Sequence, residues 1–360
     1  MDASLYFVIM AGGRGTRFWP RSRTKRPKQL LDIVGSKTIL EQTIDRLLPI
    51  TDWDHIFIVT EISQAEAVRA LLPDLPEARL IVEPLGRNTA PCIGLAALIL
   101  AEIDPSATMA VLPADHFISQ VPSFQKTLLE AARAAQNGDF LITLGIRPTF
   151  PETGYGYLER GGKVMEVGGH QVWEVKAFHE KPDRAKAEAM LKTGLFFWNS
   201  GMFVWTVSSI LGQMSRLTPA MYDELIKLKK FLKGPEWEKA LTAGYEAMEN
   251  ISIDFAVMER ADKVLMLEGD FGWNDVGSWE AVYQLKPKDE QGNCLTGPVL
   301  VLDSKGCLVH SPDKTVALIG VENLIVVETP DALLICPRER SQEVKQIVQL
   351  LEVQKKFELL

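Results

Sequence analysis

Short apolar runs alternate with apolar residues at helical spacing over the first 145 residues of the chain. Short uninterrupted apolar runs are typical of buried strands, whereas apolar residues three and four positions apart predict amphipathic helices. The predicted strands are 6–11, 55–60, 79–82, 108–112 and 140–145, and the predicted helices are 39–48, 64–72, 90–102 and 124–137.

This alternation of strands and helices predicts a three-layer α/β/α domain, in which a mostly parallel, Rossmann-like sheet is covered on both faces. In such sheets ligands bind beyond the carboxyl ends of the strands. We therefore expect functional residues in the loops that follow Ala11, Val82 and Leu112.

The pattern changes in the second half of the chain. Residues 154–181 predict short strands with Gly turns, and residues 208–259 are mostly helical. A polar, turn-rich segment at 287–293 predicts the boundary between a large domain, 1–288, and a small β-rich domain, 289–360. The small domain has brief β-branched runs at 299–302, 307–309, 315–319 and 324–327, and an amphipathic helix at 342–359.

Composition supports two folded domains and excludes several classes of protein. A chain of 360 residues with 46% hydrophobic content is long enough for about two domains. A net charge of −8 argues against a nucleic-acid-binding surface, which needs an extended basic face, although a local basic pocket still suits a small phosphate ligand. The four cysteines form no CxxC pair, so we expect neither a zinc site nor disulfides.

No membrane segment or export signal is predicted. The N-terminal residues lack the basic region of a signal peptide, and the apolar stretch 93–103 is too short to span a bilayer. We expect a cytoplasmic protein with no membrane partner.

The strongest candidate for chemistry is the segment AGGRGTRFWPRSRTKRPKQLL at 11–31. Glycines directly after a strand let backbone N–H groups approach phosphate oxygens, and six basic residues follow Gly15 as far as Lys28. The spacing is neither that of a P-loop nor a clean GxGxxG. A structural Gly-rich turn is the alternative interpretation.

This segment resembles the pyrophosphorylase motif of the sugar nucleotidyltransferases. Its Trp-Pro, Ser-Arg and Pro-Lys-Gln forms resemble the guanylyltransferase branch that acts on mannose 1-phosphate, although Phe18 stands where Leu is more typical. Five further segments match the same branch: EPLGRNTAP (83–91), LPADH (112–116), FHEKP (178–182), FWNSGMF (197–203) and FGWNDVGSW (271–279).

The resemblance implies transfer of GMP from GTP to mannose 1-phosphate, with pyrophosphate as the second product. It assigns catalytic roles to Arg17, Lys28, Asp115 and Asp275, and nucleotide binding to Gly12, Gly13, Arg14, Gly15, Thr16, Arg87, Asn88 and Thr89. For Asn88 and Thr89 the residues alone favour a simpler role as caps of the following helix.

The resemblance also implies that Asp115 and Asp275 hold Mg²⁺, which prefers carboxylate oxygens. A lone Asp115 would instead suggest a turn or a helix cap. Sugar-phosphate binding falls to Gly156, Glu180, Lys181 and Asn199, and the alternative for Glu180 and Lys181 is an exposed ion pair. His116 and His179 receive no role.

No nucleophile on the protein is needed, because the oxygen of a sugar 1-phosphate is already anionic at neutral pH. One alternative is another sugar 1-phosphate as substrate. A second is a catalytically silent subunit, which should have lost at least one key residue, but this chain has all five: Arg17, Lys28, Asp115, Lys181 and Asp275. No His-rich metal-binding stretch follows the tail, so we expect no additional isomerase activity. By resemblance, the C-terminal domain is expected to be a left-handed β-helix-like unit that forms a homodimer.

Overall fold

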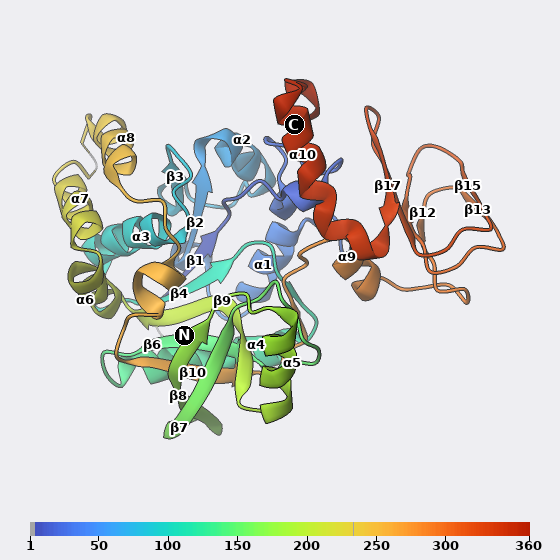
Figure 1. Ribbon diagram of the computed structural model, residues 1–360. Helices are drawn as coiled ribbons and strands as arrows, with labels where there is room; N and C mark the ends of the chain where they lie inside the picture. Colours follow the sequence, from blue (N-terminus) through green and yellow to red (C-terminus); the bar gives the residue numbers. More distant parts are fainter. Residues whose placement is uncertain (1–3, 233) are drawn as a thin grey trace.

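The computed structural model describes residues 4–232 and 234–360. A nine-stranded sheet forms the centre of the large body, in the order β3-β2-β1-β4-β9-β6-β10-β8-β7 (Figure 1). Its strands are β1 Leu5–Met10, β2 Ile56–Glu61, β3 Leu80–Glu83, β4 Thr108–Pro113, β6 Leu141–Ile146, β7 Tyr157–Val167, β8 His170–His179, β9 Phe196–Thr206 and β10 Val264–Gly269.

Most strands of this sheet run in one direction. Strand β1 pairs in parallel with β2 and β4, β2 with β3, and β6 with β10. Strand β9 is antiparallel to both β4 and β6, so the two parallel groups share one direction. The predicted mostly parallel, Rossmann-like sheet is confirmed.

Helices cover both faces of the sheet. Successive side chains of each strand point to opposite faces, so each face carries apolar side chains that the helices bury. Phe7 and Ile9 belong to one hydrophobic cluster, whereas Tyr6 and Val8 belong to the other. The first face is covered by α1 Ile39–Leu47, α2 Ile62–Leu71 and α4 Val121–Gln136, and the second by α3 Thr89–Ile103, α6 Val207–Leu217, α7 Pro219–Lys229 and α8 Trp237–Ala247.

The hairpin of β7 and β8 corrects the prediction of short strands at 154–181. These strands have 11 and 10 residues and turn at Gly168 and Gly169, both with positive φ. The hairpin lies at the edge of the sheet, and its charged, partly exposed side chains interrupt the apolar pattern, so the strands look shorter than they are. Helix α5 Arg184–Thr193 follows the hairpin.

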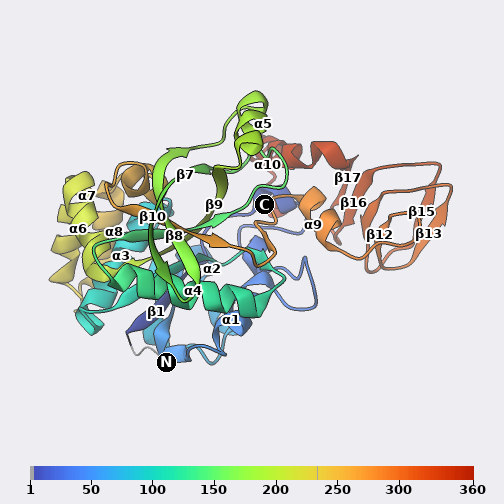
Figure 2. The ribbon, with the colours of Figure 1, turned by 90° about the horizontal axis from the view of Figure 1, so that it is seen from below.

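The C-terminal strands form a β-helix-like unit that extends away from the large body (Figure 2). Strands β12, β14 and β16 pair in parallel in that order, β13 pairs in parallel with β15, and β17 closes antiparallel on β16. Their bounds are β12 Cys294–Thr296, β13 Val299–Leu302, β14 Leu308–His310, β15 Val316–Ile319, β16 Leu324–Glu328 and β17 Leu333–Pro337.

Two helices, α9 Trp279–Leu285 and α10 Val344–Val353, lie between these strands and the large body (Figure 2). The prediction of one helix over 342–359 was too long, because 338–343 and 357–359 form 3₁₀ turns. The four cysteines are free, and no helix among the described residues is long and apolar enough to cross a membrane.

Candidate active site

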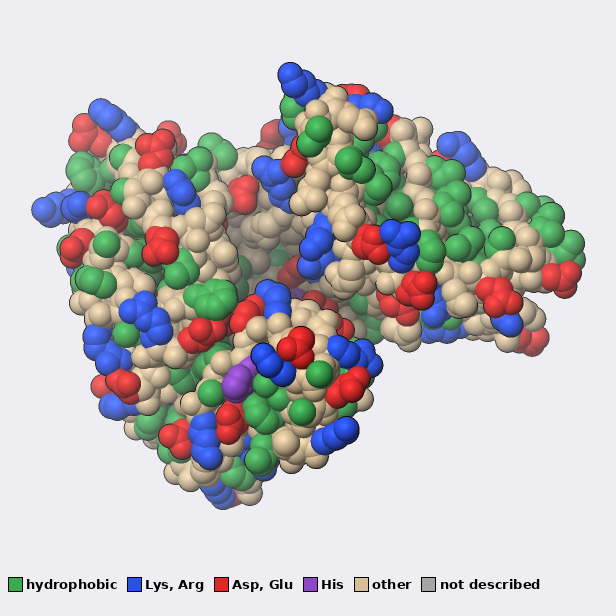
Figure 3. Space-filling view, in the orientation of Figure 1, with side chains coloured by type: hydrophobic (Ala, Val, Ile, Leu, Met, Phe, Trp, Pro, Cys, Tyr) green, Lys and Arg blue, Asp and Glu red, His purple; other side chains and the backbone are tan. Residues whose placement is uncertain are grey.

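Two cavities open beside the loops that follow the parallel strands, and Figure 3 shows the hollow in this face of the molecule. One, of about 330 Å³, lies next to the hairpin and is lined by Gly156, Glu180 and Lys181; we call it the hairpin cavity. The other, of about 310 Å³, is lined by Thr16 and Arg17 of the glycine-rich loop; we call it the loop cavity.

Three residues line both cavities: Asp115, His116 and Asp275. Asp115 and His116 follow β4, and Asp275 follows the short strand β11 Trp273–Asn274, which pairs with β5 Phe117–Ile118. The two carboxylates that the sequence assigned to one site therefore come together at the junction of the cavities.

Lys28 connects the two sides of this junction. Its ammonium donates to the Asp115 carboxylate at 2.8 Å and to the backbone carbonyl of Asp275 at 2.5 Å. Only 5% of Lys28 is exposed, which keeps this charge largely out of bulk solvent. Burial alone would raise the pKa of Asp115, but its neighbours, chiefly the charge and hydrogen bond of the Lys28 ammonium, together hold that pKa below its ordinary value.

Gly15 lets the loop reach Lys28. Its φ of 59° lies in the left-handed region, and a Cβ at this position would stand 2.5 Å from the Cβ of Lys28. Behind the loop, the buried amide of Gln29 donates to the carbonyl of Ala11 and to the side chain of Gln64, both at 2.9 Å. The loop is therefore held by buried polar contacts, and Gln64 is a supporting residue that the sequence motifs did not reveal.

The Asp275 carboxylate is oriented from the hairpin side. The Tyr155 hydroxyl donates to its Oδ1 at 2.6 Å, and burial together with this carboxylate raises the pKa of Tyr155. At Gly277 a Cβ would come within 2.8 Å of Asp275 Oδ2, so glycine leaves the other oxygen accessible from the loop cavity. Hard carboxylate oxygens beside both cavities fit a divalent cation shared with phosphate oxygens.

His116 is a neutral imidazole at pH 7. Burial lowers its pKa to about 4, even though the neighbouring Asp115 acts in the opposite direction. The Trp273 indole donates to its Nδ1 at 3.1 Å, so the single ring proton belongs on Nε2, which lies 3.9 Å from the Asp115 carboxylate. His116 therefore adds no positive charge to the junction at pH 7.

The hairpin cavity contains the residues predicted to contact the sugar phosphate. Lys181, with φ of 42°, donates to Glu180 at 2.5 Å, so the ion pair expected in the alternative interpretation exists but faces the cavity. The backbone N–H of Asn199 donates to the carbonyl of Gly156 at 2.8 Å, which brings β9 and the Gly154–Gly156 turn together.

Asp254 is a cavity residue that the motifs missed. It begins a π-helix, Asp254–Met258, a helical form that is rare and frequent at functional sites. Its Oδ1 accepts from the Asn199 amide at 2.7 Å, and burial raises the pKa of Asp254. The sequence predicted only that Asp254 lies in a helical stretch. Its hydrogen bond to Asn199 joins residues 55 positions apart, which no local pattern indicates.

A buried carboxyl group, Glu83, ends β3 beneath Gly12. The Tyr245 hydroxyl donates to its Oε1 at 3.0 Å, and a Cβ at Gly12 would lie 4.0 Å from its Oε2. Glu83 is 4% exposed, and burial raises its pKa to about 7 despite the hydrogen bond from Tyr245. Glu83 therefore lies beneath Gly12, which lines the hairpin cavity, and its carboxyl group titrates close to neutral pH.

Several predicted nucleotide contacts are engaged elsewhere. Arg14 pairs with Glu352 at 3.3 Å, and Arg87 donates to the carbonyls of Tyr245 and Glu246 in α8 at 3.0 and 3.2 Å. Asn88 caps α3 by accepting from the backbone of Thr89 at 2.9 Å, as its simpler interpretation expected.

The remaining predicted residues of these loops lie at or beside the cavities. Gly12 and Thr89 line the hairpin cavity, and Gly15, Thr16 and Arg17 line the loop cavity. Gly13 lines neither, and its carbonyl accepts weakly from the Gln29 and Gln64 amides at 3.5 and 3.4 Å.

Two family models match the chain: "nucleotidyl transferase" over residues 6–292, and "MannoseP isomerase/GMP-like beta-helix domain" over residues 297–351. A mannose-1-phosphate guanylyltransferase of Klebsiella pneumoniae is 40% identical, over an alignment that covers 98% of this chain and 74% of the relative. The alginate biosynthesis protein AlgA of Pseudomonas aeruginosa is 38% identical over 98% of this chain and 73% of its own length.

A solved structure is also similar to this chain over nearly its full length. The crystal structure of a Thermus thermophilus protein, described as a mannose-1-phosphate geranyltransferase, matches with a TM-score of 0.86 and 35% identity, over 97% of this chain and 99% of that one. With these similarities over nearly its full length, the chain belongs to the mannose-1-phosphate guanylyltransferase family of nucleotidyl transferases.

Proposed function

We propose that this protein transfers GMP from GTP to mannose 1-phosphate, giving GDP-mannose and pyrophosphate. The observation that carries the proposal is the pair of cavities meeting at Asp115 and Asp275, in a chain of this family. A reaction that joins a sugar phosphate to a nucleotide and releases pyrophosphate needs both substrates to meet at one place, and the two cavities provide that place where they join.

The charges of the two cavities support a division of the substrates. Lys181 is the one Lys or Arg among the described residues lining the hairpin cavity, whereas Arg17, Lys28 and Lys345 line the loop cavity. A single cation suits a sugar monophosphate, and several cations suit a polyphosphate. We assign the mannose and guanosine ends of the product to the hairpin cavity and the departing pyrophosphate to the loop cavity.

In the proposed reaction an anionic oxygen of mannose 1-phosphate attacks the α-phosphorus of GTP in line. The new P–O bond forms as the bond to the β-phosphate oxygen breaks, and pyrophosphate leaves with the electron pair. Lys28, held at the junction, meets the charge that grows on the transferring and leaving groups, and Arg17 stabilises the leaving phosphates.

Members of this family generally use a divalent metal ion. We propose Mg²⁺, for which Asp115 and Asp275 supply carboxylate oxygens at the junction. When bound, the ion neutralises charge on the phosphate oxygens. Tyr155 orients the Asp275 carboxylate for this purpose.

For the sugar, we propose that Glu180 and the Asn199–Asp254 pair contact mannose hydroxyls, with Gly156 beside them and Lys181 on the phosphate. Nucleotide contacts are proposed for Gly12, Gly13, Gly15, Thr16 and Thr89. Contacts of Arg14, Arg87 and Asn88 with the nucleotide stay predictions, because these side chains bind protein groups in the structure.

We further propose two domains, 1–288 and 289–360, and a cytoplasmic homodimer formed by the C-terminal unit. Its strands expose large apolar side chains, among them Leu300 and Ile319 on the β13–β15 sheet and Leu333 and Ile335 on β17. Charged substitutions at Leu300 and Ile319 are expected to yield a monomer in sedimentation experiments.

The test of the proposed activity is pyrophosphate release from a panel of nucleoside triphosphates and sugar 1-phosphates. We expect the fastest release with GTP and mannose 1-phosphate. A clear preference for UTP or dTTP would refute the guanine assignment, and a preference for another sugar 1-phosphate would refute the mannose assignment. Absence of release with every pair would support a catalytically silent subunit.

A further inference from the structure

Lys345 places a cation from the C-terminal part of the chain at the loop cavity, beside Arg17 and Lys28. It lies in the first turn of α10, outside residues 6–292, which match the nucleotidyl transferase model. Its side chain is exposed, and no ion pair among the described residues includes it. Lys28, by contrast, is already paired with Asp115.

Helix α10 is packed firmly against the glycine-rich loop. Val344, Val348 and Leu351 of the helix share a buried hydrophobic cluster with Phe18 and Trp19 of the loop. A helix fixed by such a cluster holds its exposed side chains at defined positions near the loop.

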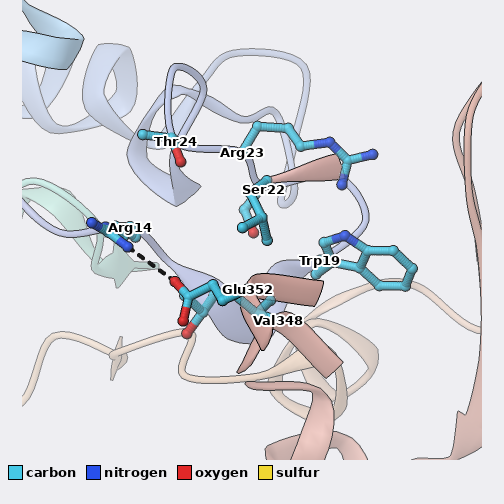
Figure 4. A pocket seen from close by; sticks show the side chains of 9 residues that line it. Arg14, Trp19, Ser22, Arg23, Thr24, Val348 and Glu352 are labelled. Atoms are coloured by element: carbon cyan, nitrogen blue, oxygen red, sulfur yellow. Dashed lines mark hydrogen bonds and ion pairs between the residues drawn. The ribbon is translucent and has the colours of Figure 1, made fainter. Parts of the chain in front are cut away.

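Polar contacts at the end of the chain add to this packing. The Trp19 indole donates to the carbonyl of Leu359 at 3.0 Å, and the backbone of Thr24 donates to the carbonyl of Leu360 at 2.9 Å. Figure 4 shows the side chain of Arg14, in the glycine-rich loop, paired with Glu352 of α10. The C-terminal residues therefore pack against the glycine-rich loop beside the loop cavity.

The position of Lys345 within the site suggests which phosphates it meets. Lys28 contacts Asp115 and Asp275 at the junction, where the α-phosphorus reacts in the proposed function. Lys345 lines the loop cavity but not the hairpin cavity, so it faces the part that receives the leaving phosphates.

Building on the proposed function, we propose that Lys345 binds the β- and γ-phosphates of GTP and the pyrophosphate formed from them. The C-terminal β-helix-like part would then complete the active site of its own chain, through α10, in addition to any role in assembly. A cation that meets the phosphates in both the ground state and the product should act mainly on binding.

The experiment compares the variants Lys345→Ala and Lys345→Arg with a control on the same segment, Lys356→Ala, whose side chain is exposed and lines neither cavity. Initial rates are measured in both directions, so that the KM of GTP, mannose 1-phosphate, pyrophosphate and GDP-mannose are all obtained. Calorimetric titration of each variant with pyrophosphate and with GTP, without the sugar substrate, gives a readout independent of turnover. Thermal melting confirms that the variants are folded.

We expect Lys345→Ala to raise the KM and Kd of GTP and pyrophosphate about tenfold, with little change for mannose 1-phosphate and GDP-mannose. Lys345→Arg should retain most of the affinity, and Lys356→Ala should match the wild type. Unchanged binding of GTP and pyrophosphate by Lys345→Ala, or an equal loss for all four ligands, would overturn the inference. If the wild type instead binds GTP and pyrophosphate but forms no GDP-mannose, the proposed function fails while the titrations still decide the role of Lys345.

Discussion

The hairpin cavity and the loop cavity meet at the same carboxylates but are built in different ways. The hairpin cavity rests on strands and on polar pairs: Asn199 with Asp254, which is partly buried, and Glu83 with Tyr245, which is buried. The loop cavity consists of a loop held by Gln64 from α2 and by α10 from the other end of the chain.

This difference suggests a division of labour. A site on strand ends with satisfied buried groups holds its side chains precisely, which suits discrimination between sugar hydroxyls. A loop supported by several distant segments places cations around charged phosphates, which requires charge more than shape. Substitutions in the loop cavity should therefore affect turnover or the binding of GTP and pyrophosphate, and those in the hairpin cavity should affect selectivity and affinity for the sugar phosphate.

The largest effect is expected at the junction itself. Asp275→Asn keeps the shape and the hydrogen bond from Tyr155 but removes the charge, so kcat should fall by about two to four orders of magnitude. The control is Asp270→Asn, an exposed carboxylate that lines neither cavity. Equal turnover of Asp275→Asn and wild type at saturating Mg²⁺ would show that this carboxylate is only structural.

Lys28→Ala should come next, with kcat lowered by about two to three orders of magnitude, because Lys28 meets charge that grows during transfer. Steady-state rates at saturating substrates measure the effect, and circular dichroism verifies folding, since Asp115 loses its partner. Lys25→Ala, an exposed lysine in the same loop, is the matched control. A change confined to the KM of mannose 1-phosphate would contradict the division between the cavities.

Glu83 gives a prediction for stability against pH. Its pKa of about 7 in the folded protein lies above the ordinary value of 4.5, so the native state binds more protons than the unfolded chain between these values. This group therefore makes the wild type less stable as pH rises from about 4.5 to 7, by roughly 3 kcal/mol.

Glu83→Gln keeps an acceptor for Tyr245 but removes this titration. Urea unfolding at pH 4.5, 6 and 7.5 should show the variant gaining roughly 3 kcal/mol relative to wild type as pH rises. If the difference between the two proteins is independent of pH, Glu83 does not titrate as the burial of its carboxyl group indicates.

The smallest effect is expected for Lys181→Ala, which removes an exposed charge from the hairpin cavity. The KM of mannose 1-phosphate should rise about tenfold while kcat changes little, because this contact is made in the ground state and the transition state alike. Lys192→Ala on the nearby helix α5 is the control. An effect on the KM of GTP alone would contradict the assignment of Lys181 to mannose 1-phosphate.

The sequence predicts the parallel half of the sheet well, because buried strands such as 108–113 are uninterrupted apolar runs between helical patterns. It predicts the hairpin poorly, because an edge strand such as β7 mixes apolar and charged side chains. The motifs also indicated Lys28, Asp115 and Asp275, which the structure places together although 247 positions separate Lys28 from Asp275.

Other site features depend on contacts that no local pattern contains. Asp254 joins Asn199 only through the folded sheet, and Lys345 reaches the loop cavity only because α10 packs on Phe18 and Trp19. For Arg14 the motif predicted a nucleotide contact, but the structure pairs it with Glu352 from the end of the chain. Long-range packing decides such positions, so the sequence alone leaves them open.

The most direct test of the division between the cavities is a crystal structure with GDP-mannose bound, followed by one with pyrophosphate. We predict the mannose ring beside Glu180 and Asn199, the diphosphate at Asp115 and Asp275, and pyrophosphate in the loop cavity beside Arg17. A mannose ring in the loop cavity, or pyrophosphate in the hairpin cavity, would contradict the account.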